Sequence, residues 1–272
     1  MTITISKYKR KCNNLSGKEW LQNSISIWSN LKKAQDENNR DHPASFPRAL
    51  VRRLLDCFTN DCDKVVLDPF VGAGTTIVEA LSQGKFGIGV DVYGAFLEKS
   101  ETRLNQTNLF NNKTSSYRLI HDSAINLRKY LDDDSVDIII TSPPYWDILN
   151  QKRTADGKEI KTYGNNQEDL GTIKEYSVFL TALSKIFGEI SLILKKDKYC
   201  IINVMDVRKG PVLYTIHSDL TNFLANYGYE LDDLIIWDRS HEYNNLRPLG
   251  YPTVFRINRI HEYLLVFRNR RL

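Results

Sequence analysis

The stretch "VVLDPFVGAGTTIVEAL", Val65 to Leu81, decides the fold of this 272-residue chain. An apolar β-branched run ends at Asp68, a loop with Gly72 and Gly74 follows, and two threonines open an apolar helical pattern. Glycine at a strand-to-helix turn lets the backbone approach a ligand closely, and a helix N-terminus offers free N–H groups. The stretch predicts a strand, a ligand-binding loop and a helix. Its glycine spacing is neither the dinucleotide fingerprint GxGxxG nor a phosphate loop.

Further apolar β-branched runs follow this stretch and alternate with helical patterns. Apolar faces with helical spacing cover 179–194 and 213–227, and a third covers 51–58, where Pro47 fits the first helical turn. Near-continuous apolar strands separated by helices indicate a parallel sheet covered on both faces. The predicted strands are 65–67, 87–91, 117–121, 136–141 and 199–205.

The last part of the chain breaks this alternation. "LIIW" at 234–237 and "YLLVF" at 263–267 are separated by a polar, turn-rich segment and predict a closing hairpin. We therefore expect a doubly wound, Rossmann-like α/β sheet, mostly parallel with an antiparallel last strand at its edge. The expected organisation is one domain over 1–272. It has a helical N-terminal segment, 1–60, and two polar inserted loops, 148–171 and 240–258.

Composition limits the class of protein. A hydrophobic content of 42% supports a substantial core, and a net charge of +4 permits a polyanionic partner. The four cysteines form no CxxC pair and no zinc-ligand pattern, which favours free buried thiols in a reducing compartment and no metal. No apolar run approaches the ~20 residues of a membrane helix, so we expect a cytoplasmic protein without a membrane partner. The basic runs at 7–11 and 268–271 are either solvated tails or phosphate contacts.

Two further stretches suggest chemistry. "TSPPYWD", Thr141 to Asp147, follows the apolar run "VDIII", and its two prolines fix the backbone and remove two donors, which suggests a built site. Asp91 ends the run "FGIGVD", where a carboxylate can accept hydrogen bonds from both hydroxyls of a ribose. A nucleoside-containing ligand fits this pattern, and a helix N-cap is the alternative role for Asp91.

Together these motifs resemble the S-adenosylmethionine-dependent DNA methyltransferases that modify exocyclic amino groups. The resemblance rests on "DPFVGAGTT", "GIGVD" and "TSPPYW". "HPASFP", at 42–47, resembles the family's methionine-side motif, and "NRIHEYLLVFR" resembles its last conserved strand. With "LSGKEWLQNSISIW" near the start, the likeness extends over most of the chain. It implies S-adenosylmethionine as cofactor and double-stranded DNA with a flipped base as partner. A cognate restriction endonuclease or specificity partner, and a monomer or homodimer, are left open.

The resemblance also implies roles for individual residues. Ser142 and the carbonyl of Pro143 would accept hydrogen bonds from the target amine, while Tyr145, with Trp146 beside it, would stack on the base. No catalytic cysteine is needed, unlike in the cytosine-carbon enzymes. The expected catalytic residues are Ser142, Pro143, Pro144, Tyr145 and Trp146. The expected cofactor-binding residues are His42, Pro43, Ala44, Phe46, Pro47, Asp68, Pro69, Phe70, Gly72, Gly74, Thr75, Thr76, Asp91 and Asp122.

Several alternatives stay open. In the resembling family a serine at position 142 accompanies N4-cytosine modification, so we expect N4-methylcytosine in DNA, in a restriction-modification or defence context. The alternatives are an N6-adenine enzyme, an RNA amino-methyltransferase and a non-catalytic subunit. Asp122 fits a helix cap as well as an adenine contact.

For other residues the ordinary roles compete with the functional ones. Trp20 and Trp28 are core residues or border the active site, and His42 and His261 fit structural roles. Candidate DNA contacts are Arg239, Arg247 and Arg256.

Overall fold

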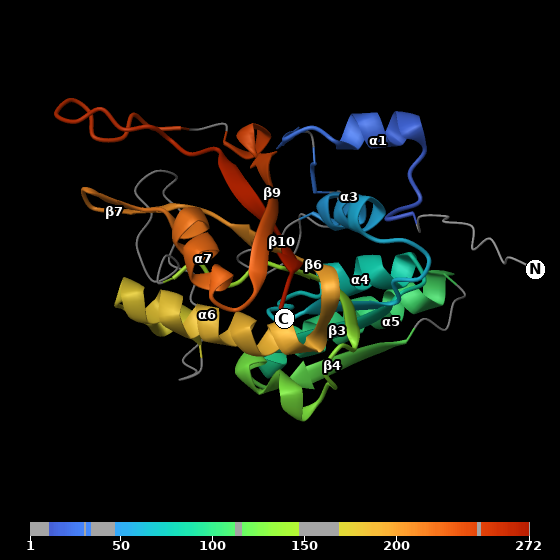
Figure 1. Cartoon of the computed structure of the whole chain (residues 1–272). Coiled ribbons are helices and arrows are strands. Elements are labelled where there is room, and N and C mark those ends of the chain that lie inside the picture. Colours follow the sequence, from blue (N-terminus) through green and yellow to red (C-terminus); the bar gives the residue numbers. More distant parts are fainter. Residues whose placement is uncertain are drawn as a thin grey trace, which may run out of the picture.

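One mixed sheet organises the chain in its computed structural model, which describes residues 11–29, 31–33, 47–111, 116–146, 169–243 and 246–271. Across these residues the strand order is β1-β9-β10-β6-β5-β2-β3-β4 (Figure 1). A separate hairpin pairs β7 (Val207–Lys209) with β8 (Val212–Tyr214). The strands of the sheet are β1 (Ile27–Trp28), β2 (Val65–Asp68), β3 (Phe86–Asp91), β4 (Tyr117–His121), β5 (Val136–Thr141), β6 (Leu194–Val204), β9 (Tyr229–Asp238) and β10 (His261–Asn269).

Strand direction confirms most of the predicted topology. Strands β2 to β6 pair in parallel with one another, whereas β10 pairs antiparallel with both β6 and β9. The predicted hairpin and antiparallel last strand are therefore confirmed. The predicted position of that strand is wrong, because β10 lies inside the sheet and the two-residue β1 continues beyond β9 as a parallel edge.

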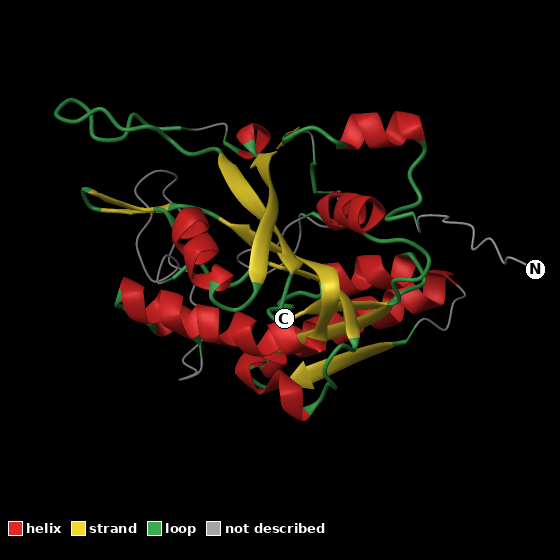
Figure 2. Ribbon diagram, viewed as in Figure 1, coloured by secondary structure: helices red, strands yellow, loops and turns green. Residues whose placement is uncertain are grey.

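Helices cover both faces of the sheet (Figure 2). On one face α3 and α4 pack together and α4 packs against α5, while on the other α6 contacts η1 and α7. Their bounds are α1 (Gly17–Asn23), α3 (Arg48–Phe58), α4 (Thr75–Ser82), α5 (Gly94–Asn111), η1 (Ala124–Lys129), η3 (Leu170–Thr172), α6 (Tyr176–Ile193), α7 (Ile216–Ala225) and η4 (Ser240–Glu242).

Neighbouring residues of each central strand belong to different cores. In β2, Val66 packs with the α3 side and Leu67 with the α6 side, and in β5 Ile138 and Ile139 divide in the same way. Successive side chains of a strand point to opposite faces, so a sheet covered on both sides needs apolar residues at every position. This requirement explains why the strands read as near-continuous apolar runs.

Some local predictions need correction. Pro47 is the N-cap of α3, not part of its first turn, and Leu213 lies in the β7–β8 hairpin, not in α7. Cys200 is buried and Cys57 partly buried, but Cys12 and Cys62 are exposed, so the prediction of buried thiols holds for only part of the set.

Helix α6 is 18 residues long and mostly apolar. Among the described residues it is the one helix that could cross a membrane by length and composition. Phe179, Leu183 and Phe187 on this helix are fully buried in the main core, so packing inside the protein accounts for its apolar character.

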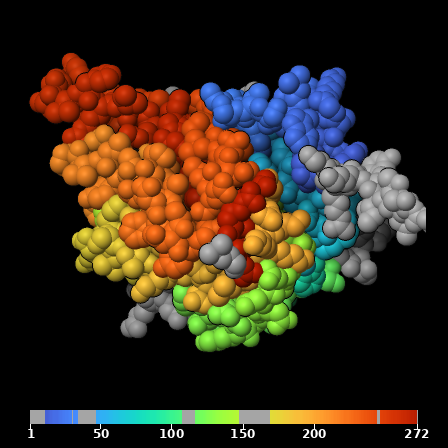
Figure 3. Space-filling view, in the orientation of Figure 1, coloured from blue at the N-terminus to red at the C-terminus, as the bar shows by residue number. Residues whose placement is uncertain are grey.

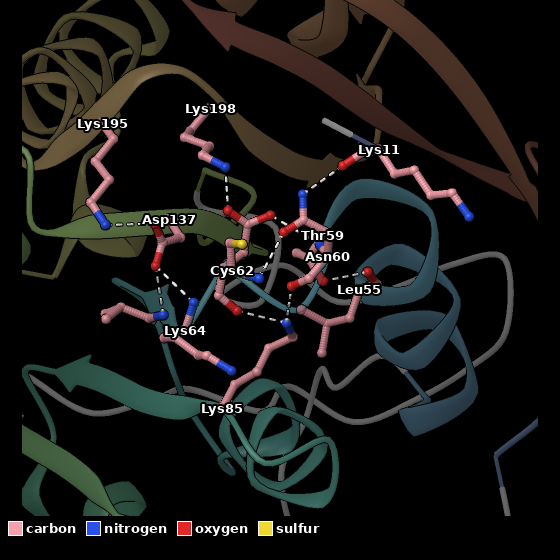
Figure 4. Close-up of polar contacts among 12 residues, drawn as sticks. Lys11, Leu55, Thr59, Asn60, Cys62, Lys64, Lys85, Asp137, Lys195 and Lys198 are labelled. Carbon is pink, nitrogen blue, oxygen red and sulfur yellow. Dashed lines mark hydrogen bonds and ion pairs between the residues drawn. The ribbon is translucent and has the colours of Figure 1, made fainter. Parts of the chain in front are cut away.

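Polar contacts secure the amino ends of the central strands. Asp137, in β5, accepts hydrogen bonds from the backbone N–H groups of Lys64 and Val65 and from Lys195 Nζ at 2.6 Å (Figure 4). Burial disfavours the charged form of this carboxylate, but the hydrogen bond from Lys195 and those from the backbone outweigh it and lower the pKa of Asp137. The contacts join β2, β5 and β6 at the edge where these strands begin.

We predict that Asp137→Ala lowers the free energy of unfolding by about 2–4 kcal/mol, because it leaves two backbone donors without their acceptor. Urea unfolding at neutral pH measures this change. The pKa of Asp137 is lowered in the folded protein, so its stabilising effect is present above the ordinary value of 3.8 and is lost as the pH falls through the folded value.

The matched control is Lys195→Ala, which removes the ion pair and keeps the backbone hydrogen bonds. The lysine side chain is 40% exposed, so the expected loss is below about 1 kcal/mol. Equal losses for the two variants would contradict the role given to the backbone contacts.

Candidate active site

The carboxyl ends of the parallel strands gather the polar residues of the candidate site at one edge of the sheet. Strands β2, β3 and β4 follow one another outward, and β5 then returns to the other side of β2. Ligands of doubly wound sheets bind at such a reversal of strand order. Here the reversal lies between Asp68, at the end of β2, and Thr141, at the end of β5.

Asp68 connects the two sides of this reversal. Its carboxylate accepts hydrogen bonds from Thr76 Oγ1 at 2.6 Å, from Thr141 Oγ1 at 2.6 Å and from the Phe70 N–H at 3.1 Å. The side chain is 2% exposed, and burial raises its pKa to about 6 despite these donors. Asp68 therefore fixes the Gly-rich loop, the start of α4 and the end of β5 relative to one another.

The predicted strand, loop and helix are all present at Val65–Leu81. Gly74 is the N-cap of α4 with φ +76°, and a Cβ there would lie 2.9 Å from the side chain of Ser100. The loop contacts β3 through the Val71 N–H, which donates to Val90 O at 2.9 Å. Glycine is thus required at position 74 by both backbone conformation and close packing. Pro69, Thr75 and Thr76 are buried, and Phe70 is partly buried.

Asp91 lies at the end of β3 and contacts the same loop. Its Oδ2 accepts from the Gly72 N–H and its Oδ1 from the Tyr93 N–H, both at 2.9 Å. Burial raises the pKa of Asp91 to about 6, and the two backbone donors oppose this shift. Each carboxylate oxygen has a second lone pair, so the residue can still accept hydrogen bonds from a diol.

The remaining expected cofactor residues divide into two groups. Asp122 accepts from the Ser123 N–H, from Asn126 Nδ2 and from Tyr130 Oη, and the hydrogen bonds from Asn126 and Tyr130 lower its pKa. Ser123, not Asp122, is the N-cap of η1, and it makes no side-chain capping hydrogen bond, so the capping role considered for Asp122 is wrong. His42, Pro43, Ala44 and Phe46 lie outside the described residues.

Ser142 follows β5 directly and contacts a buried polar network. Its Oγ lies 2.8 Å from Tyr145 Oη, which donates to Glu262 Oε2 at 3.0 Å and accepts from Asn203 Nδ2 at 2.8 Å. Pro143 is buried, while Pro144 and Tyr145 are partly exposed. Burial, and next the charge of Glu262, raise the pKa of Tyr145 well above its ordinary value, so the phenol keeps its proton.

Sequence reasoning missed Asn203 and Glu262, and it assigned Arg239 to DNA. Asn203 ends the apolar run of β6, Glu262 lies at the start of β10, and each is 3% exposed. Arg239 forms ion pairs with Glu262 and Glu242, and its contact with DNA stays a prediction. The sequence did carry a signal for Asn203. It is a polar residue near the carboxyl end of a predicted parallel strand, in "IINV", where ligands of such sheets bind.

Trp146 does not have the position expected of it. The indole is 4% exposed and packs against Tyr176 and Tyr214, with ring centroids 5.2 and 4.8 Å away, and Lys209 Nζ lies 4.2 Å from the ring centroid. It therefore presents no open face to a base, and the expected stacking role is wrong for this residue. Its partners come from α6 and the β7–β8 hairpin, which only the fold brings together.

Two inserts leave the sheet beside the site. The first departs after Trp146 and returns at Asp169, which accepts from Tyr93 Oη at 2.7 Å. A Cβ at Gly171 would lie 3.6 Å from Trp146 O, so the two ends of this insert are adjacent. Most of it, 147–168, lies outside the described residues.

The second insert connects the end of β9 to the start of β10 and includes a projecting segment, 246–257, which we call the arm (Figure 3, upper left). Tyr251 is 79% exposed and Phe255 is 94% exposed. Arg247 is exposed, whereas Arg256 is partly buried and donates to Gly210 O.

Other candidate residues have structural roles. Trp28 is 1% exposed under Arg53, as expected for a core residue, but Trp20 is 48% exposed and is not one. His261 packs edge-on against Tyr263. In the C-terminal basic run, ion pairs hold the arginines 268, 270 and 271, so this run is not a solvated tail.

Comparison with known proteins finds relatives that match part of the chain. The Type II methyltransferase M.ScaI of Streptomyces caespitosus is 33% identical over 102 residues, 35% of this chain and 31% of that protein. M.HpaI of Haemophilus parainfluenzae is 34% identical over 101 residues, 36% of this chain and 30% of that protein. The matched region thus spans about a third of the length of each relative.

A solved structure supports the fold alone. The precorrin-6y C5,15-methyltransferase of Geobacter metallireducens superposes with a TM-score of 0.51 at 14% identity, over 86% of this chain and 94% of that one. The predicted doubly wound α/β fold is confirmed. The family model described as DNA methylase, for N6 and N4 methyltransferases, matches residues 2–102 and 136–271. The match covers well over half of the chain, which therefore belongs to this family of exocyclic-amino DNA methylases.

Proposed function

We propose that the protein transfers a methyl group from S-adenosylmethionine to the N4 amine of a cytosine flipped out of double-stranded DNA. The observation that carries the proposal is the hydrogen-bonded link through Asp68, which holds the loop before α4 next to Ser142. A donor bound on that loop and an amine bound at Ser142 would then meet at the reversal of strand order. Type II methyltransferases among the relatives favour a restriction-modification context with a cognate endonuclease.

The residues around the Gly-rich loop fit the proposed cofactor. Asp91 keeps lone pairs for the two ribose hydroxyls, since its bonds to Gly72 and Tyr93 each use only one per oxygen. Asp122, whose lowered pKa keeps it charged, can accept from the adenine amine. We also propose that the segment 42–47 contacts the methionine end of the cofactor.

The proposed chemistry depends on acceptors for the target amine. An exocyclic amine is a poor nucleophile because its lone pair is delocalised into the ring. Ser142 Oγ and the carbonyl of Pro143 would accept its two N–H groups and turn the lone pair out of conjugation. When bound, S-adenosylmethionine would supply an electrophilic methyl group on a cationic sulfur. The ring of Tyr145 is the proposed stacking surface for the base.

N6-adenine methylation is the second candidate. Adenine and cytosine each present an amine beside a ring nitrogen, so the same two acceptors serve either base. Ser142 favours cytosine through the family resemblance described above.

The arm is the proposed contact with DNA. It begins and ends at the carboxyl edge of the sheet, where the site lies, and it combines exposed aromatic side chains with Arg247. Apolar and aromatic side chains can enter or stack on bases, and arginine can bind phosphate or guanine.

We predict that wild-type protein, incubated with labelled S-adenosylmethionine and unmethylated DNA, produces N4-methylcytosine. Mass spectrometry of the hydrolysed nucleosides identifies the product. N6-methyladenine would replace the cytosine assignment with the second candidate. Transfer to RNA alone would contradict the DNA substrate, and cofactor binding without transfer to varied DNA would favour a non-catalytic subunit.

We predict that Asp91→Ala weakens S-adenosylmethionine binding about 10–100-fold, because it removes charged acceptors for the ribose. The pKa of Asp91 is raised to about 6, so the carboxylate forms as the pH rises from 5 to 7 and wild-type affinity should rise with it. Calorimetric titrations across this range measure both effects.

DNA affinity serves as the control, because it should change little in Asp91→Ala. The pKa of Asp68 is also raised to about 6, but Asp68 is present in both proteins, so the difference between them isolates Asp91. If the ratio of the wild-type to the Asp91→Ala affinity for S-adenosylmethionine does not vary with pH, the ribose role of the Asp91 carboxylate is contradicted.

We predict that Phe255→Ala weakens DNA binding about 5–20-fold through loss of contact with the bases. Arg247→Ala should instead lower the slope of log affinity against log salt concentration by about one, the change expected for the loss of one phosphate contact. Fluorescence anisotropy with a labelled duplex at several salt concentrations measures both.

The control for these arm variants is Leu21→Ala on α1, since Leu21 is also apolar and is 74% exposed. It should leave DNA affinity unchanged, and none of the three substitutions should alter cofactor affinity. An arm variant with wild-type DNA affinity would exclude that side chain from the interface.

A further inference from the structure

The network beneath Ser142 has a fixed direction of hydrogen bonding. Glu262 Oε1 accepts from Arg239, and Glu262 Oε2 accepts from both Tyr145 Oη and Asn203 Nδ2. A carboxylate paired with arginine can only accept hydrogen bonds, so it takes the single proton of Tyr145. Asn203 is also oriented by Glu262, because the reverse orientation of its amide would set Oδ1 against the carboxylate.

This direction determines what Ser142 can do. Tyr145 gives its proton to Glu262 and accepts a hydrogen bond from Asn203. The remaining contact of Tyr145 Oη, with Ser142 Oγ at 2.8 Å, therefore requires Ser142 to donate. Once that proton points inward, the lone pairs of Ser142 Oγ face outward.

We propose that Glu262 and Tyr145 are positioning residues that hold Ser142 Oγ as an obligate acceptor for the target amine. The inference rests on the proposed function and adds the reason why a hydroxyl works there. A free hydroxyl can donate as readily as it accepts. An outward proton would repel the amine hydrogens, or would bind the nitrogen lone pair and block its attack on the methyl group. The buried carboxylate removes this second state.

The test uses the full chain and three variants. Every variant carries Asn203→Ala, because a reversed Asn203 amide would otherwise accept from Tyr145 in place of the carboxylate. In that background Glu262→Gln keeps the shape but offers an N–H to Tyr145, whose proton then turns to Ser142 and sends the serine proton outward. We expect kcat for methyl transfer to fall about 10–100-fold, with Kd for S-adenosylmethionine and for DNA within about twofold of Asn203→Ala alone. Tyr145→Phe keeps the ring but disconnects Ser142, which then samples both states, so we expect a smaller fall of about 3–10-fold.

The double variant Tyr145→Phe/Glu262→Gln gives the decisive comparison. Since phenylalanine cannot transmit the reversal, the double variant should be faster than Glu262→Gln alone and close to Tyr145→Phe. Loss of activity through damaged structure would make the double variant no faster than either single variant. Melting temperatures accompany every rate, and the control is Glu230→Gln, because the side chain of Glu230 is 59% exposed and pairs with Arg270.

The outcomes separate this inference from the proposed function. If wild type methylates DNA and the double variant is no faster than Glu262→Gln, the inference is overturned while the function stands. Should Glu262→Gln fail to fold, Tyr145→Phe decides, because an unchanged kcat in that variant overturns the inference. A wild-type chain without transfer to DNA overturns both.

Discussion

A single buried carboxylate, Asp68, holds together the parts of this protein that would have to act together. Its contacts with Thr76, Thr141 and the backbone of Phe70 join α4, the end of β5 and the Gly-rich loop. The surrounding apolar core could tolerate small shifts between these elements, because apolar packing is not directional. Hydrogen bonds to one carboxylate are directional. They keep the loop and Ser142 in register where the strand order reverses.

The same edge of the sheet holds three carboxylates whose pKa values are shifted. Burial raises the pKa values of Asp68 and Asp91 to about 6, whereas hydrogen bonds lower that of Asp122. At the opposite edge Asp137 has a lowered pKa and connects strands. Perturbed carboxylates thus occur at both edges, so a shifted pKa alone does not mark a site.

The sequence predicted the central sheet well, because strands buried on both faces leave a clear pattern. The runs 117–121 and 136–141 match β4 and β5 at both ends. It did not predict β1 or the β7–β8 hairpin, which are two or three residues per strand and carry no periodicity. The position of β10 between β6 and β9 depends on pairing between distant segments, which local pattern cannot specify.

The candidate site divides in the same way. Motifs located Asp91 and Ser142, because strand ends before loops are visible in sequence. The roles of Trp146 and Glu262 were not visible in the sequence. Trp146 is buried by Tyr176 and Tyr214, which lie far from it along the chain. Glu262 contacts Tyr145 across 117 positions.

The insert that departs at Trp146 and returns at Asp169 has its two ends in contact, one fixed by aromatic packing and the other by Tyr93. When the ends of a loop are held together by the scaffold, its length has little effect on the stability of that scaffold. The segment between them can therefore be lengthened, shortened or exchanged while the sheet stays unchanged. Evolution could vary what such a protein selects at this position separately from the chemistry it performs.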